Sequence, residues 1–493
     1  MSIKAEVGRN YFVYYPHCNY PDVAPYNPEE RYPEYPFEFE ESSNLGRNDI
    51  YRMMRELFVS CNMDIENYNS AEWNPLGEYI KPGNTVLIKP NLVLHDNKAE
   101  TDEQRKMDCL ITHPSIVRCL FDYVYIALKG KGEIIIADAP VQDCKFEELL
   151  QKSGYGKLFH EILRKNSNEI TINVADLRDT VLEIEAGKLR QRENRGKKYN
   201  GRIVDLANNS MFENIDGKNK LRITNYASND TVFHHNKGRN EYCVSEALLK
   251  ADVVINVPKP KTHRIAGYTA ALKNMIGINT RKEYLPHHRK GAKGKSGDEY
   301  VGTHKILKQI NSTGNDIKNL ALKHQNDFWV DFFNRICRYT GKKLDELEDN
   351  RKKFGMWYGN DTLWRTILDV NKIVYFCDKS GNMCSKPQRK VLHFGDMIVC
   401  GEKEGPLRPT YKKVGGILFS ENPVTFDLYV VKLMGFDYDK VPTLFNALKK
   451  CNLNQEDIDE IKLCSNENMF NKKIMDIKYN FGFEASSGWR EFL

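Results

Sequence analysis

Short apolar runs alternate with longer amphipathic runs along most of the chain. Four short runs predict buried strands: NTVLIKPN (84–91), GEIIIADAP (132–140), ADVVINVPKPKTH (251–263) and GDMIVCGEKEGP (395–406). A fifth run, NKIVYFCD (371–378), also predicts a strand. Each run is apolar nearly throughout, which is typical of strands covered on both faces in a parallel sheet.

The longer runs predict helices at 47–63, 113–130 and 422–435. In the second, Pro114 suits the first helical turn, Thr112 or His113 suits the cap, and Gly130 suits the end. A helix of this length between two apolar strands predicts a right-handed unit with parallel strands. We therefore expect an α/β fold, in which a mainly parallel sheet has helices on both faces.

Changes in composition along the 493 residues predict five segments. We expect a Tyr/Pro-rich N-terminal arm and helix at 1–80, an α/β core lobe at 81–300, a helical insertion at 301–360, a continuation of the α/β core at 361–450, and a C-terminal tail at 451–493. The aromatic side chains of the arm need burial, so the arm is expected to wrap round the core.

Composition limits the class of protein. An apolar content of 41% and a charged content of 28% are those of a globular protein, and the net charge of +6 permits anionic ligands without indicating nucleic acid. The first residues lack the apolar region of a signal peptide, and no run reaches membrane-spanning length. We expect a cytoplasmic protein without a membrane or nucleic-acid partner. The 12 cysteines form no CxxC pair, which predicts free thiols and argues against an iron–sulfur cluster or a structural zinc site.

Polar side chains follow the ends of the four apolar runs. They are Lys89 and Asn91 after the first run, Asp138 after the second, Lys259, Lys261 and His263 after the third, and Glu402 after the fourth. Ligands of open α/β sheets bind outside the carboxyl ends of the strands, so we expect these side chains to surround one crevice. The alternative is that prolines end the strands and that the lysines are solvated loop residues.

The segment GYTAALKNMIG predicts a helix that begins near Gly267 and packs closely on the sheet through its small residues. Its N-terminus would present free N–H groups beside His263, which suits a carboxylate or phosphate. Lys273 and Asn274 lie on this helix, among apolar neighbours that favour a buried, functional ammonium at Lys273. The alternative is a structural lysine whose ammonium extends to solvent.

Several runs resemble one family in the same order. VLIKPNLV, THPSIVRCL, IIIADAP, ADVVINVPKPKTHRIAGYTAALKNMIGI and NPVTFDLYVVKLMGFD are similar to the family called domain of unknown function three-six-two, from Val86 to Met434 with interruptions at 155–235 and 281–360. Many members carry a cysteine-rich ferredoxin-like segment, which this sequence lacks. Members of the longer type are similar to proteins encoded near bacterial surface-polysaccharide genes, so the resemblance implies a role in polysaccharide biosynthesis.

Residues 251–278 are also similar to a segment of nickel-pincer lactate racemases, and this resemblance implies a racemase-like N-terminal lobe. His263 falls on a histidine that transfers protons at the substrate carbon, and Lys273 on the lysine that carries the pincer nucleotide. However, the Gly-Gly-Arg before that lysine is Ala-Ala-Leu here, and Asp138 stands in place of the second histidine. A nickel ligand would have to come from His287 or His288. We therefore expect an unmodified Lys273 and no nickel pincer nucleotide, and we assign neither a metal nor a cofactor.

Other candidates carry less information. The pairs His234–His235 and His287–His288 lack a third metal ligand at a suitable spacing. Arg365 resembles a clamp for a substrate carboxylate, and Asp361 a helix cap. The basic segment 188–202 predicts an exposed loop or hairpin, and 281–295 predicts a Gly/Lys loop that could close over an anionic substrate.

The leading hypothesis is an isomerase- or epimerase-like enzyme that performs acid/base chemistry at carbon on a small anionic metabolite, either a carboxylate or a sugar-phosphate-type compound. The predicted catalytic residues are His263, Asp138 and Lys273, and the predicted substrate-binding residues are Lys89, Asn91, His113, Lys259, Lys261, Asn274, Arg365 and Glu402. One alternative is a transferase or ligase that acts on an activated sugar. Another is a non-catalytic scaffold that docks polyanions through 188–202 and 281–295. The cysteine spacing disfavours a redox role.

Overall fold

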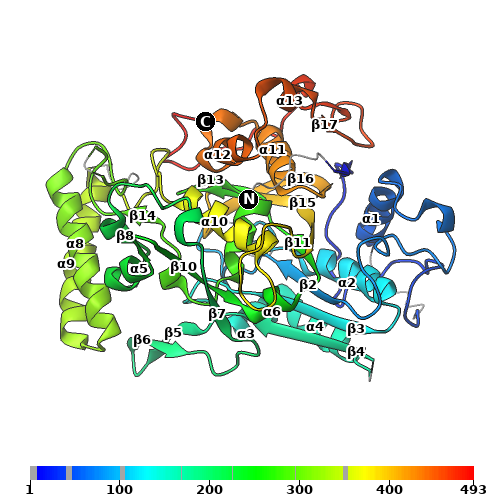
Figure 1. Cartoon of the computed structure of the whole chain (residues 1–493), viewed down its shortest axis with the longest axis horizontal. Coiled ribbons are helices and arrows are strands. Elements are labelled where there is room, and N and C mark those ends of the chain that lie inside the picture. Colours follow the sequence, from blue (N-terminus) through cyan, green and yellow to red (C-terminus); the bar gives the residue numbers. More distant parts are fainter. Residues whose placement is uncertain are drawn as a thin grey trace.

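The fold centres on one large sheet, in which Figure 1 labels β2, β3, β4, β11, β15 and β16. The computed structural model describes residues 8–39, 47–99, 106–167, 169–224, 226–294, 296–347 and 353–493. Within these residues the sheet has nine strands, seven of them in the order β1-β16-β15-β11-β2-β3-β4. Their bounds are β1 Asn10–Tyr14, β2 Thr85–Pro90, β3 Gly132–Asp138, β4 Ile170–Asp176, β11 Val253–Val257, β15 Lys390–Glu404 and β16 Arg408–Ser420.

The middle of the sheet is parallel. β11 lies between β2 and β15 and runs parallel to both, and β3 and β4 extend the parallel set beyond β2. The other edge is antiparallel, since β15 and β16 form a long hairpin and β1 pairs with β16. The short strands β12 (Lys261–His263) and β13 (Gly267–Thr269) pair with each other, and β12 also pairs with β15. The prediction of a mainly parallel α/β sheet is therefore confirmed.

Successive side chains of a strand point to opposite faces of the sheet, and here the side chains on both faces are apolar. Helices therefore cover both faces. On one face Val86 and Ile88 pack with α1 (Asp49–Ser60), α2 (Pro114–Leu128) and α4 (Tyr155–Leu163). On the other face Leu87 packs with α6 (Glu246–Lys250) and α10 (Leu363–Phe376). α11 (Pro423–Met434) and α12 (Pro442–Lys450) share a further buried cluster with α7 (Ala271–Asn274). His113 caps α2 as predicted, accepting a hydrogen bond from Ser115 N.

The remaining elements surround this core. Beside the sheet lie α3 Phe146–Ser153, β5 Thr180–Glu185, β6 Lys188–Glu193, β7 Gly201–Asp205, β8 Leu221–Arg222, α5 Ser228–His234, β9 His235–Asn236, β10 Arg239–Ser245 and β14 His288–Arg289. Later in the chain come α8 Lys305–Lys323, α9 Asp327–Glu346, α13 Gln455–Glu460, β17 Lys462–Leu463 and β18 Lys472–Lys473. Parts of the predicted arm (1–7 and 40–46), residue 295 of the basic loop and residues 348–352 of the predicted insertion lie outside the described residues.

Two predictions of local structure are wrong. Residues 371–378 do not form a strand, because they belong to the end of α10 and the turn after it, and the β-branched run is buried on all sides of that helix. The helix expected from Gly267 begins only at Ala271. Gly267 instead starts β13 with a φ of +82°, and a Cβ there would lie 3.0 Å from the Trp489 ring. The close approach of Trp489 and the left-handed backbone both favour strand and turn at this position.

Candidate functional site

A cavity of about 400 Å³ opens at the carboxyl ends of β2, β3 and β11. The loops that follow these strands, together with α7 and the segment after it, form its walls. Among its lining residues are Asn91, Asp138, Lys261, His263, Lys273, Asn274, Lys282 and His287. Six of these eight side chains were predicted as site residues from the sequence, and the structure brings those six together around one space.

Asp138, which lines the cavity, forms a buried ion pair with Lys89. Nζ of Lys89 donates to Oδ1 of Asp138 at 2.7 Å, and the backbone N–H groups of Leu92 and Ala139 also donate to the same carboxylate. Burial lowers the pKa of Lys89, and the attraction of Asp138 opposes that shift. A Cβ at Gly277 would lie 2.1 Å from Oδ1 of Asp138, so only glycine allows the backbone to cover the pair this closely.

Three asparagine side chains form a hydrogen-bonded chain, and two of them, Asn91 and Asn274, line the cavity. Asn91 Nδ2 donates to Asn274 Oδ1 at 3.0 Å, and Asn274 Nδ2 donates to Asn256 Oδ1 at 2.8 Å. Asn256 Nδ2 in turn lies within hydrogen-bond distance of both Ala271 O and Nδ1 of His393. A chain of satisfied buried amides fixes the position of each group. The network therefore orients Asn91 and Asn274 toward the cavity.

Three lysines reach the cavity without a carboxylate partner among the described residues. Lys261 donates to Asn91 Oδ1 (3.1 Å) and to Leu110 O, and Lys282 donates to Ala139 O (2.8 Å) and Asn279 O (3.4 Å). Lys273, whose side chain is half-buried, makes neither a hydrogen bond nor an ion pair with any described residue.

The surroundings of these three lysines lower their pKa values. Burial, and then repulsion by Lys259, lowers the pKa of Lys261 to about 7. Burial also lowers the pKa of Lys282 to about 7, and burial with repulsion by Lys89 lowers that of Lys273 to about 8. An unpaired ammonium in a desolvated place is unfavourable unless an anion accompanies it. The cavity is therefore electrostatically suited to an anionic ligand.

Two histidines enter the cavity in different tautomeric states. The backbone N–H groups of Ile265 and Ala266 donate to Nδ1 of His263 at 3.0 and 3.1 Å, so a neutral His263 carries its proton on Nε2. Nδ1 of His287 instead lies 2.7 Å from Leu285 O, to which it donates, so Nε2 of a neutral His287 holds a lone pair. Burial, followed by repulsion from Lys273, lowers the pKa of both rings, to about 3 for His287. Both rings are thus neutral in the free protein.

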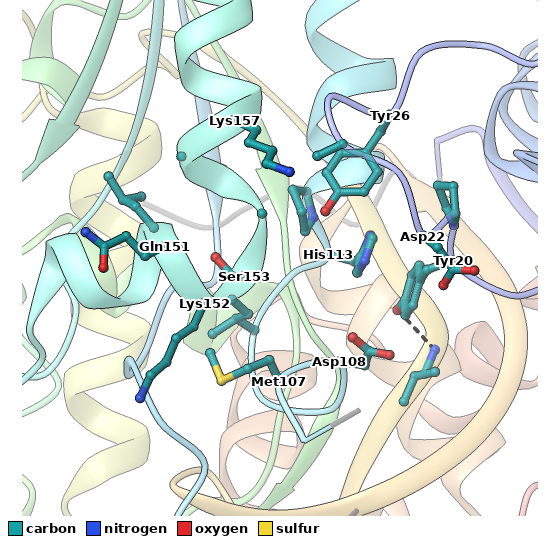
Figure 2. A pocket seen from close by; sticks show the side chains of 18 of the residues that line it. Tyr20, Asp22, Tyr26, Met107, Asp108, His113, Gln151, Lys152, Ser153 and Lys157 are labelled. Carbon is teal, nitrogen blue, oxygen red and sulfur yellow. Dashed lines mark hydrogen bonds between the residues drawn. The ribbon is translucent and has the colours of Figure 1, made fainter. Parts of the chain in front are cut away.

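Lys259 and His113 do not line this cavity. Lys259 Nζ pairs with Asp396 at 2.6 Å and donates to Tyr20 OH at 2.7 Å. His113 stacks on Tyr20, with ring centroids 3.9 Å apart. Tyr20 and His113 line a second cavity, of about 920 Å³, between the N-terminal segment, α3 and α4. Figure 2 shows this second cavity, with Tyr20 hydrogen-bonded to the Val399 backbone. The expectation that one crevice gathers all the strand-end lysines is therefore wrong for Lys259, whose charge Asp396 balances, and for Lys89, which pairs with Asp138 and does not line the cavity.

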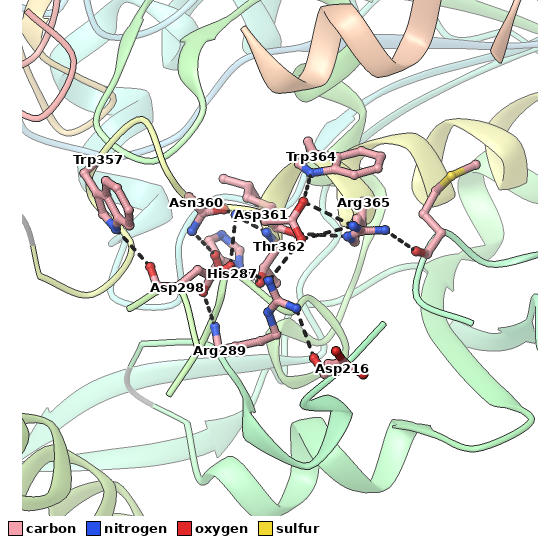
Figure 3. Close-up of polar contacts among 12 residues, drawn as sticks. Asp216, His287, Arg289, Asp298, Trp357, Asn360, Asp361, Thr362, Trp364 and Arg365 are labelled. Atoms are coloured by element: carbon pink, nitrogen blue, oxygen red, sulfur yellow. Dashed lines mark hydrogen bonds and ion pairs between the residues drawn. The ribbon is translucent and has the colours of Figure 1, made fainter. Parts of the chain in front are cut away.

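Arg365 also lies elsewhere. It pairs with Asp361 at 3.0 Å and donates to Met211 O, in the network that Figure 3 shows. Asn360, rather than Asp361, accepts hydrogen bonds from the first N–H groups of α10. An arginine four residues after an aspartate at a helix start pairs with it locally, and for that reason Arg365 is not directed at the cavity. The network still supports the site, because Asn360 Nδ2 donates to His287 O at 2.9 Å.

Glu402 lies inside a strand and not at a strand end. β15 continues to Glu404 in its hairpin with β16, and Glu402 pairs with Thr410 across that hairpin. Its carboxylate accepts a hydrogen bond from Glu484 N and contacts Lys412. Because the hairpin extends beyond the parallel sheet, the charge of Glu402 is directed at the C-terminal segment. Glu404, two residues later, does line the cavity.

The start of the short helix α7 is already occupied by a carboxylate of the protein. Asp427 Oδ1 accepts the N–H of Ala271 at 2.7 Å, and Oδ2 accepts the hydroxyl of Tyr268 at 2.6 Å. Burial raises the pKa of Asp427 to about 7. The anion predicted for this helix N-terminus is therefore Asp427 itself, and a ligand must bind through side chains.

Sequence reasoning missed Lys282 and considered His287 only as a metal ligand. A detectable signal existed for Asn256, because an asparagine in the apolar strand VVINV must find hydrogen-bond partners. No local pattern marks Lys282 or His287, which reach the cavity only through the path of the loop after α7. Among the described residues, His, Cys, Asp and Glu side chains form no group of three suited to a metal ion, and no helix has the length and apolarity needed to cross a membrane.

Comparison with known proteins gives one match. A sequence model of the family described as "Domain of unknown function (DUF362)" matches residues 86–171 and 163–432, which include every residue of the cavity discussed above. No curated protein matches the chain.

Proposed function

The chain belongs to the family described as Domain of unknown function (DUF362), and we propose that its central cavity binds a small anionic metabolite and transfers a proton at one of its carbon atoms. The single observation that carries this proposal is the set of three lysines, Lys261, Lys273 and Lys282, that reach one cavity without a carboxylate partner in the described part of the chain. Carboxylate and sugar-phosphate-type compounds supply the missing charge.

The three lysines have different roles in binding the anion. Lys261 and Lys282 are held by carbonyl and amide oxygens, so their ammonium groups have fixed positions. Lys273 has no such partner and is free to contact the anionic group directly. Asn91 and Asn274 are fixed by their mutual hydrogen bond and can orient uncharged parts of the ligand. A preorganised set of donors of this kind binds an anion without reorganising on binding.

The two histidines supply opposite functions in proton transfer. His263 presents Nε2–H and is a hydrogen-bond donor or acid, whereas His287 presents an Nε2 lone pair and is an acceptor or base. This assignment replaces Asp138 as the opposing base, because the Asp138 carboxylate already accepts hydrogen bonds from Lys89, Leu92 and Ala139. Asp138 then acts as a positioning residue for Lys89.

The charge of a bound anion raises the pKa of His287, the proposed base. The low pKa of His287 has burial as its first cause and the ammonium of Lys273 as its second. An anion that pairs with Lys273 offsets the second cause and so raises the pKa of His287. The resemblance to nickel-pincer lactate racemases supports the same type of reaction, because those enzymes also move a proton at a substrate carbon. We infer isomerase- or epimerase-like chemistry.

Hydrogen exchange at carbon tests this proposal without knowledge of the product. The purified protein is incubated in D₂O with hydroxy acids, sugar acids and sugar phosphates, and loss of C–H signals is followed by proton NMR. We expect at least one of these anions to exchange a C–H hydrogen faster than in protein-free solution. If anions bind but none exchanges, proton transfer at carbon is the wrong reaction class.

A further inference from the structure

The helices α8 and α9 form an antiparallel hairpin that stands at one side of the molecule, in yellow-green in Figure 1. α9 is 20 residues long, yet only two of its side chains, Thr340 and Leu344, are buried. Asp327, at its start, pairs with Lys188 and Arg190 of β6. Along its length α9 contacts α8, through Cys337 against Gly314 and through Thr340 against Asn311. One long face of this helix therefore has no partner within the described chain.

Large apolar side chains are exposed at regular intervals along both helices. They are Ile306, Ile310, Ile317 and Leu320 on α8, and Phe328, Trp329, Phe332 and Tyr339 on α9. Ile306 is 79% exposed, Phe328 68% and Tyr339 63%. Apart from the adjacent pair Phe328 and Trp329, the steps between neighbours are three, four or seven residues, so each set lies on one side of its helix. This spacing is typical of a seam between packed helices.

Both seams point to the same side of the hairpin. At about 100° per residue, the seam of α8 lies about 110° from the line Asn311–Gly314 that contacts α9, and that of α9 lies about 125° from the line Cys337–Thr340 that contacts α8. Because the helices run antiparallel, these two rotations carry both seams to one side. Ser312 points to the other side, where it donates to Glu299 of the main body. The two seams form one continuous outer face.

The charge on α9 shows what kind of partner fits this face. α9 has four acidic residues and four basic residues, so its net charge is zero: Asp327, Asp331, Asp345 and Glu346 against Arg335, Arg338, Lys342 and Lys343. α8 has four lysines and one aspartate, a net charge of +3, but Lys308 donates to Val301 O, Lys318 donates to Asn315 Oδ1 and Lys323 pairs with Asp230. At about 100° per residue, none of these four lysines lies on the side of α8 that carries Ile306 and Ile317. A surface for nucleic acid or anionic lipid would carry a clear positive excess. An apolar, nearly neutral face instead suits another protein surface of the same kind.

We propose that this face binds the same face of a second copy of the chain, so that two hairpins form a four-helix bundle across a two-fold axis. Two helices of 19 and 20 residues are about 28–30 Å long and lie about 8–10 Å apart, which gives roughly 1,000 Å² of total buried surface. That area reaches the lower bound, about 1,000 Å², for a specific interface. With the axis along the helices, α8 of each copy packs antiparallel to α9 of the other, and aliphatic side chains meet aromatic ones.

Sedimentation velocity of the full chain tests the dimer directly. We expect the wild type to sediment as a dimer at micromolar concentration and the double variant Ile310→Glu, Phe332→Glu to dissociate roughly 100-fold more readily. Both positions are about half exposed, so the charges do not enter a core. Ile184→Glu, on β5 at a position that is 73% exposed, is the matched control and should remain a dimer.

Three results would overturn the inference. The wild type could be a monomer at these concentrations. It could be a dimer that the double variant leaves intact, which would place the interface elsewhere. It could also bind anionic phosphatidylserine vesicles in a flotation assay through these residues, which would make the face a membrane contact. Circular dichroism of the double variant should match that of the wild type. If it does not, the single variants Ile310→Gln and Phe332→Gln take its place in the same measurement.

Discussion

His263 and His287 line the same cavity, and each bonds to the backbone through Nδ1 but in the opposite role, as acceptor in His263 and as donor in His287. Two backbone N–H groups donate to Nδ1 of His263, whereas Nδ1 of His287 donates to Leu285 O. In each ring Nε2 therefore points away from the backbone. Nε2 of a neutral His263 carries the proton, and Nε2 of a neutral His287 does not. The protein has set a donor and an acceptor beside an ammonium group, Lys273, that repels protons from both rings.

Substituting either histidine separates proton transfer from binding. We expect His263→Gln and His287→Gln each to slow hydrogen exchange at the substrate carbon by about 10²–10⁴-fold. The affinity for an anion should change little in either variant, because the lysines provide most of the charge. The measurements are NMR exchange rates and calorimetric titrations on the same preparations. Equal exchange rates in variant and wild type would contradict the assigned roles.

Lys273→Met should stabilise the empty protein. The ammonium of Lys273 lacks a partner among the described residues and its pKa is lowered to about 8, so its charge opposes folding at neutral pH. Each pKa unit corresponds to about 1.4 kcal/mol, and since water reaches this half-buried side chain we expect a gain of only about 1 kcal/mol. The control is Lys89→Met, which leaves Asp138 buried and unpaired and should cost about 3–5 kcal/mol. Thermal melting without added anions distinguishes the two, and a loss of stability in Lys273→Met would contradict this reading.

Anion affinity should fall as the pH rises from 7 to 9. The lysines that face the cavity bind an anion only when protonated, and in the free protein their pKa values are about 7 for Lys261 and Lys282 and about 8 for Lys273. An anion raises these values, so binding is strongest below pH 7 and weakens as the lysines lose their protons. Sulfate is a suitable probe because its charge is constant in this range. Loss of one proton from Lys273 alone gives about a tenfold decrease. A constant affinity between pH 7 and 9 would rule out the lysines as the binding groups.

Asp427 should make the stability of the folded protein fall as the pH rises from 4 to 7. Its pKa is raised to about 7 in the folded protein, from about 3.9 in an unfolded chain. The folded state therefore holds this proton more tightly, and the resulting stabilisation is present below pH 4 and is lost as the pH rises to 7. In Asp427→Asn this contribution is absent. We expect the difference in melting temperature, wild type minus variant, to decrease from pH 4 to pH 7, and a constant difference would contradict the raised pKa.

The apolar runs predicted the parallel sheet and the position of the site at its carboxyl ends, because burial on both faces leaves a strong local signal. They did not distinguish a helix from a strand at 371–378, since a fully buried helix and a buried strand share the same composition. The helix start at Ala271 was also hidden, because it depends on Trp489 and Asp427, far away in sequence.

Within the site, the sequence identified the residues that directly follow strands but not their partners. Lys259 and Lys261 are two residues apart and look equivalent, yet Asp396 neutralises the first and no carboxylate in the described chain reaches the second. Arg365 was misassigned for the same reason, because its pairing with Asp361 is a property of the folded turn. Which charges are balanced is a three-dimensional property, and it decides which lysines are available to a ligand.

The most direct test of the account is anion-dependent thermal stabilisation in matched lysine variants. Sulfate and malonate are added to the wild type, to Lys261→Met, to Lys273→Met and to Lys157→Met, which places the same substitution in the second cavity. A ligand that binds only the folded state at about 100 times its Kd adds about 2.7 kcal/mol. We predict a rise in Tm for the wild type and for Lys157→Met, and little or none for Lys261→Met and Lys273→Met. An equal rise in all four proteins would contradict the central claim that this cavity binds anions through its uncompensated lysines.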